Sequence, residues 1–131
     1  MQILTPFLRK VLIADAAISS VAGLAMIGGA DFTHDLLGLP SGLIFWSGVS
    51  LIPFIATLAM VIRANAAPAA LIVTIIALNF AWVAASLFVA FGPVFAPTLI
   101  GQLFVCAQAA TVFLFAELQV MGLRRTGHAT A

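Results

Sequence analysis

Charge is the property that this chain has least of. Charged residues make up 7% of its 131 residues, whereas about 25% is usual for a soluble domain. No charged residue occurs between Arg63 and Glu117. A surface built from such a stretch could not be hydrated, and this excludes a water-soluble domain. Because hydrophobic residues make up 64% of the chain, the sequence predicts an integral membrane protein.

Cysteine, histidine and basic residues are also too few for several classes of function. Cys106 is the one cysteine, which excludes a disulfide framework within the chain and a CxxC redox pair. Five basic residues provide no basic face for nucleic acid. No histidine falls inside an apolar run, which excludes a haem held by two histidines of one chain. We therefore expect no cofactor and no nucleic-acid partner.

Four long apolar runs define the predicted fold. They predict helices over about residues 11–30, 43–62, 68–91 and 98–121. At 1.5 Å per residue, each run is long enough to cross about 30 Å of hydrocarbon, and the alternation that a β-barrel requires is missing. A short interfacial helix is expected over about 32–37. The prediction is an all-α integral membrane protein, a four-transmembrane-helix bundle in a single membrane domain, residues 1–131.

The basic residues predict the orientation of the bundle. They are Arg9, Lys10, Arg63, Arg124 and Arg125, and all lie at run ends that meet on the same side of a membrane. Because basic residues accumulate on the cytoplasmic side, both termini and the loop after Arg63 are predicted to be cytoplasmic. The pattern is typical of a multi-pass protein of the cell inner membrane.

Two acidic residues fall inside predicted spans. Asp15 follows Lys10 by five residues, and Glu117 precedes Arg124 by seven, so both lie at a similar depth, roughly 7–8 Å inside the cytoplasmic end for Asp15. Neither has a basic residue three or four positions away, so partners are expected on other helices, with Lys10, Arg63 and Arg124 nearest in depth. Either the two acids are structural, as ion pairs or protonated carboxyl groups, or they bind a proton or cation.

Uncharged polar side chains also fall inside the last two spans. They are Asn79, Trp82, Ser86, Gln102, Gln108 and Gln119. The first three share one helix face at 3.6-residue spacing, which is typical of contacts between helices. The glutamines lie on two nearly opposite faces of the fourth span, and a helix that is polar on two sides has partners on both. We therefore expect a second subunit against the face of Gln108 and Gln119.

The first outer loop carries Asp31, His34 and Asp35 at helical spacing. Side chains of these types can hold a metal ion. Three polar residues on one solvent-facing side are more often simply hydrated, so the pattern favours a hydrated surface over a metal site.

The order of spans and loops resembles that of small four-helix inner-membrane proteins of bacteria. The segments Leu78-Asn79-Phe80-Ala81-Trp82 and Phe115-Ala116-Glu117-Leu118-Gln119 carry this resemblance, which covers the whole chain. It implies the fold and the location. It implies no activity, because no chemistry is assigned to that group.

Two functions remain open at the level of sequence. The first is a non-enzymatic accessory subunit or self-associating bundle, because the sequence has no nucleophile–base pair, phosphate loop or metal cluster. The alternative is a small proton- or cation-coupled transporter or channel that uses Asp15 and Glu117. Membrane lipid is an expected partner, together with further copies of the chain or the subunits of a larger membrane complex.

Overall fold

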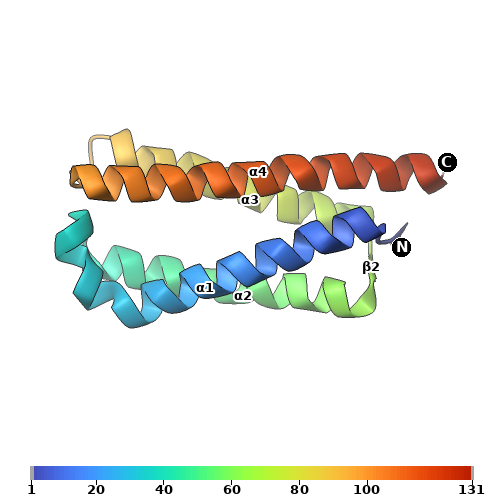
Figure 1. Ribbon diagram of the computed structural model, residues 1–131, viewed down its shortest axis with the longest axis horizontal. Helices are drawn as coiled ribbons and strands as arrows, with labels where there is room; N and C mark the ends of the chain where they lie inside the picture. Colours follow the sequence, from blue (N-terminus) through green and yellow to red (C-terminus); the bar gives the residue numbers. More distant parts are fainter. Residues whose placement is uncertain (1, 131) are drawn as a thin grey trace.

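Four helices account for almost the whole chain (Figure 1). In the computed structural model they are α1 (Pro6–Leu37), α2 (Ser41–Ala64), α3 (Ala69–Phe91) and α4 (Leu99–Thr130). The structure describes the backbone of residues 2–130 and the side chains of residues 3–124. Each helix is long and apolar enough to cross a membrane. The prediction of an all-helical fold with four helices able to span a membrane is confirmed.

The first helix is longer than the sequence predicts, because its ends are set by caps outside the apolar run. The hydroxyl oxygen of Thr5 accepts a hydrogen bond from the backbone N–H of Leu8 at 3.2 Å, and Pro6 occupies the first turn, where its missing N–H costs nothing. Gly38 ends the helix with a left-handed φ of 69°, as glycine C-caps commonly do.

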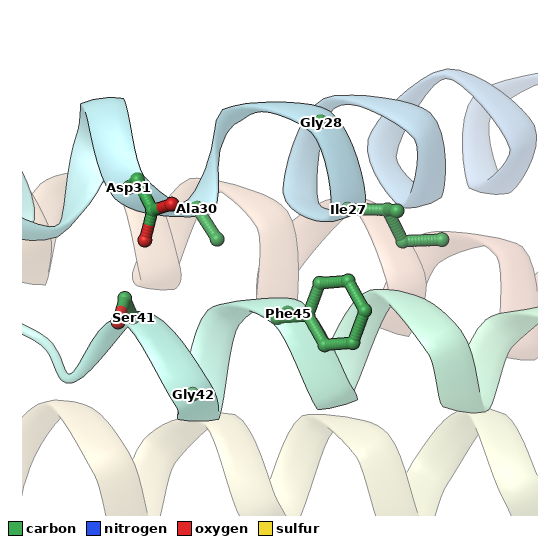
Figure 2. Close-up of a pocket in the computed structure, with 7 residues that line it drawn as sticks. All are labelled: Ile27, Gly28, Ala30, Asp31, Ser41, Gly42 and Phe45. Atoms are coloured by element: carbon green, nitrogen blue, oxygen red, sulfur yellow. The ribbon is translucent and has the colours of Figure 1, made fainter.

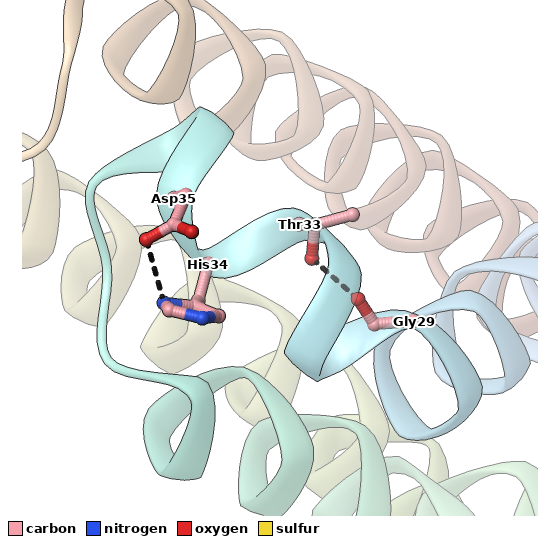
Figure 3. A network of polar contacts seen from close by, with 4 residues as sticks. All are labelled: Gly29, Thr33, His34 and Asp35. Carbon is pink, nitrogen blue, oxygen red and sulfur yellow. Dashed lines mark hydrogen bonds and ion pairs between the residues drawn. The ribbon is translucent and has the colours of Figure 1, made fainter.

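The short helix expected over residues 32–37 does not exist as a separate element. These residues are the last turns of α1, which continues without a break to Leu37. The Thr33 hydroxyl donates to the Gly29 carbonyl at 2.8 Å (Figure 3), which is a bond within a continuous helix. The expectation was wrong because neither Gly28 nor Gly29 adopts a helix-ending conformation.

The helices form two hairpins, α1 with α2 and α3 with α4, and the hairpins are joined mainly through α1 and α4. Both chain termini lie at the same end of the bundle (Figure 1). One buried apolar cluster, which includes Leu8, Leu12 and Ile75, fills the end near the termini. A second, which includes Ala30, Leu37 and Val105, fills the opposite end.

The two ends of the bundle are fastened by different backbone contacts. Near the termini, strand β1 (Gln2–Ile3) pairs antiparallel with β2 (Ala66–Ala67) in the loop between the hairpins. At the opposite end, Thr98 directly precedes α4 and binds the end of α1. Its hydroxyl donates to the Leu36 carbonyl at 2.7 Å and its N–H to the Leu37 carbonyl at 3.0 Å. Two of the carbonyl groups that the end of α1 leaves unpaired are thereby satisfied.

Glycines allow the first hairpin to pack closely. A Cβ atom added at Gly48 of α2 would lie 2.9 Å from the Cβ of Met26 and 3.0 Å from the carbonyl oxygen of Gly23 on α1. Close contact of this kind between backbones is how helices associate in lipid, where apolar burial supplies no driving force.

Candidate functional site

Asp15 is the one ionisable side chain that the described part of the bundle buries completely. It lies on α1, one turn beyond Leu12, and is 1% exposed. The adjoining apolar cluster ends at this level, so the carboxyl group lies between the two cores. An ionisable group at such a place marks a candidate functional site.

Three uncharged donors surround the Asp15 carboxyl group. The Gln119 amide of α4 donates to Oδ2 at 2.7 Å, and the Asn79 amide of α3 donates to the same oxygen at 3.0 Å. The Ser19 hydroxyl, one turn along α1, donates to Oδ1 at 3.1 Å. The Asn79 amide also donates to Oε1 of Gln119 at 2.9 Å. We call these four residues the Asp15 cluster.

The cluster links three helices because each of its members faces the bundle interior. Asn79 is 4% and Gln119 0% exposed. Gly122, one turn beyond Gln119, brings α4 close to α1, since a Cβ atom at Gly122 would lie only 3.0 Å from the Cβ of Leu8. This approach places the Gln119 amide within reach of Asp15.

Hydrogen bonds to uncharged groups, and no cation, satisfy the Asp15 carboxyl group. Among the described residues the only ion pair is that of His34 and Asp35. Lys10, Arg63 and Arg124 are exposed, so of the two structural alternatives for Asp15, an ion pair with one of these residues is not formed. Uncharged donors can satisfy a buried carboxyl group, because burial of a polar group is costly mainly when its hydrogen bonds are not made.

The structure does not bring Glu117 to Asp15. Glu117 is exposed on the outward side of α4, beside exposed Phe113, Leu114 and Met121. The two acids were expected at similar depth, but depth along a helix does not determine the direction of a side chain around it.

The expected subunit face of α4 is also corrected. Gln119 is fully buried within its own chain, so it cannot contact a second subunit. Gln108 is half-buried, and its Oε1 accepts a long hydrogen bond of 3.4 Å from the Ser86 hydroxyl. The face that the sequence assigned to a partner is therefore an inner face of the bundle.

The remaining polar residues of α3 and α4 tie these two helices together. Ser86 donates mainly within α3, to the Trp82 carbonyl at 2.7 Å, and its contact with α4 is the long bond to Gln108. Asn79 and Ser86 are buried, and Trp82 is half-buried. The Gln102 amide donates to the Ala90 carbonyl at 3.0 Å.

The possible metal ligands Asp31, His34 and Asp35 do not form a site. Nδ1 of His34 lies 3.3 Å from Oδ1 of Asp35 (Figure 3). Asp31 instead points toward Ser41 at the start of α2 (Figure 2). No group of three potential metal ligands occurs among the described residues.

Comparison with known proteins adds no relative. No family model matches the chain, and no curated protein and no solved structure matches it.

The Asp15 cluster predicts a clear difference between two substitutions. Asp15→Asn keeps an acceptor oxygen for both amides, so we expect a loss of less than about 1 kcal/mol in the free energy of unfolding. Asp15→Leu leaves the Asn79 and Gln119 amides without that acceptor, and we expect a loss larger by about 1–3 kcal/mol. Reversible unfolding in mixed micelles measures both.

Glu117→Gln is the matched control, because Glu117 is exposed, and its effect should stay within about 0.5 kcal/mol. Equal losses for Asp15→Asn and Asp15→Leu would show that the hydrogen bonds of the cluster do not hold the helices together.

Proposed function

We propose that this chain is a non-enzymatic protein of the cell inner membrane that works as a subunit, either of a larger membrane complex or of a bundle of its own copies. The observation that carries the proposal is that the polar side chains of the Asp15 cluster form their hydrogen bonds with one another. Both oxygens of Asp15 accept hydrogen bonds, and the Asn79 amide donates to both other long side chains of the cluster. Polar groups so completely engaged with one another serve the packing of helices.

The separation of the two acids favours a subunit over a transporter. A pathway that uses Asp15 and Glu117 in turn needs both groups on one route, whereas Asp15 faces the bundle interior and Glu117 faces outward. Glu117 is then available to a partner, and this role needs no movement of the Asp15 cluster.

The outward side of α4 has the spacing of a helix-packing seam. We call it the α4 outer face; its exposed residues are Leu103, Ala107, Ala110, Leu114, Glu117 and Met121. They follow one another at alternating intervals of four and three residues, which is the spacing of coiled-coil contacts.

Exposure of the α4 outer face to lipid is unfavourable in free energy because the face contains Glu117. An acidic side chain costs on the order of 2.5–3.5 kcal/mol at the centre of a bilayer, and less toward its surface. Side chains of a helix tilt toward its N-terminus, so Glu117 tilts away from Arg124 and the nearer membrane surface. A partner helix that offers a hydrogen-bond donor at this depth would remove the cost.

The proposed orientation places both termini in the cytoplasm. The exposed basic residues Lys10, Arg63 and Arg124 belong to the start of α1, the end of α2 and the C-terminal part of α4, and these helix ends lie at the end of the bundle with the termini (Figure 1). In a Cys106→Ala background, a membrane-impermeant thiol reagent applied from outside should label His34→Cys and leave Asn65→Cys unlabelled. Labelling of Asn65→Cys alone would reverse the orientation.

Association through the α4 outer face is tested by changing Glu117 and Ala110. In lipid nanodiscs, we expect Glu117→Leu and Ala110→Trp each to lower the associated fraction of the protein, with a roughly tenfold weaker affinity for a loss of about 1.4 kcal/mol. Single-molecule photobleaching counts the copies, and mass spectrometry identifies any co-purified subunit.

The matched control is Ala59→Trp, which places the same side chain at an exposed position of α2. It should leave the association unchanged. A wild-type protein that is monomeric and purifies without a partner would refute the proposal, as would Glu117→Leu protein that associates like the wild type.

A further inference from the structure

A cavity opens between α1 and α2 at the end of the bundle away from the termini (Figure 2). Its volume is about 350 Å³. On the side of α1 it is lined by Ile27, Gly28 and Asp31, and on the side of α2 by Ser41, Gly42 and Phe45. A second cavity of about 240 Å³ adjoins it at Ile27 and continues along the same two helices, past Leu24, Gly48 and Ile52.

The polar groups of this groove are concentrated at its outer end. The Asp31 carboxyl group points from α1 toward Ser41 (Figure 2). Neither side chain has a hydrogen-bond or ion-pair partner among the described residues. The other acid nearby, Asp35, already contacts His34 and does not line the groove.

Two glycines line the groove without serving the packing of the chain. A Cβ atom added at Gly28 or at Gly42 meets no atom within 4 Å. Gly48, deeper along α2, differs, because a Cβ atom there would press against α1. Glycine in a helix interior is unfavourable compared with alanine, and Gly28 lies in the interior of α1, so the space beside it points to an occupant from outside the chain.

We propose that this groove binds one phospholipid with a primary ammonium head group, of the phosphatidylethanolamine type. Its ammonium group would bind the Asp31 carboxylate and the Ser41 hydroxyl. One acyl chain would follow the apolar wall from Ile27 toward Leu24 and Ile52. The geometry fits an amphiphile that lies along the membrane normal, with a polar end at the bundle end and an apolar tail toward the bundle centre.

The chemistry of the outer end selects this head group over an anionic one. The groove lining contains an acid and no basic residue, so a head group with only negative charge would have no cationic partner there. A phosphate linked to an ammonium group can lie beside the start of α2, where Ser41 and Gly42 open the helix without a side-chain cap, while the ammonium group stays at Asp31.

Native mass spectrometry of the full chain in mild detergent tests the proposal with defined lipids. Wild-type protein should retain phosphatidylethanolamine in preference to phosphatidylglycerol of the same acyl chains. Asp31→Asn should weaken retention of phosphatidylethanolamine about tenfold, because a charge-assisted hydrogen bond is lost, and should leave phosphatidylglycerol unaffected. Asp35→Asn, a change of the same charge on a 91% exposed side chain at the same end of α1, should change neither.

Gly28→Leu tests whether the groove binds the lipid, independently of the contact between the head group and Asp31. A Cβ atom at this position meets no atom of the protein within 4 Å, so the fold and its unfolding temperature should be kept while retention of both lipids falls. Equal retention of the two lipids by the wild type would overturn the proposal, as would unchanged retention in Asp31→Asn or in Gly28→Leu. A dimer that Gly28→Leu dissociates would also overturn it, because a second copy would then occupy the groove.

Discussion

A buried carboxyl group in a membrane bundle has to be satisfied by the protein itself, since hydrocarbon offers it nothing. Asp15 meets this constraint with hydrogen bonds from Ser19, Asn79 and Gln119. The three donors come from α1, α3 and α4, so the relative rotation of three helices depends on one side chain. Apolar packing alone would specify these rotations weakly, because the faces of membrane helices are similar in hydrophobicity.

The surroundings of each acid indicate a different role. Asp15 is enclosed by donors of its own chain, Glu117 is exposed among apolar residues on α4, and Asp31 faces a groove between α1 and α2. The first position stabilises the fold. The other two leave a charge at a surface that faces lipid or the membrane boundary, and we assign these surfaces to a partner helix and to a lipid head group.

Much of the fold could be predicted from the sequence, because hydropathy and length determine membrane spans directly. The ends of α1 could not, since they depend on the Thr5 cap and on Gly38 rather than on the apolar run. In the candidate site, Asp15 and Asn79 were recognisable as polar residues inside spans. Their pairing with Gln119 was not, because it depends on how α4 is rotated, and Gly122 beside Leu8 sets that rotation only in the folded bundle. Only the depth of each polar residue along its span could be read from the sequence. By depth, Glu117 was as good a candidate for the site as Gln119, which lies two residues further along α4.

The central claim is that Asp15 holds helices together and carries no ion across the membrane. The most direct measurement is proton and monovalent-cation flux in proteoliposomes, with wild-type and Asp15→Asn protein incorporated at equal density. The account predicts the same background flux for both proteins and for protein-free liposomes, under a pH gradient and under a membrane potential. A flux that the wild type carries and that Asp15→Asn abolishes, with the fold retained, would contradict it.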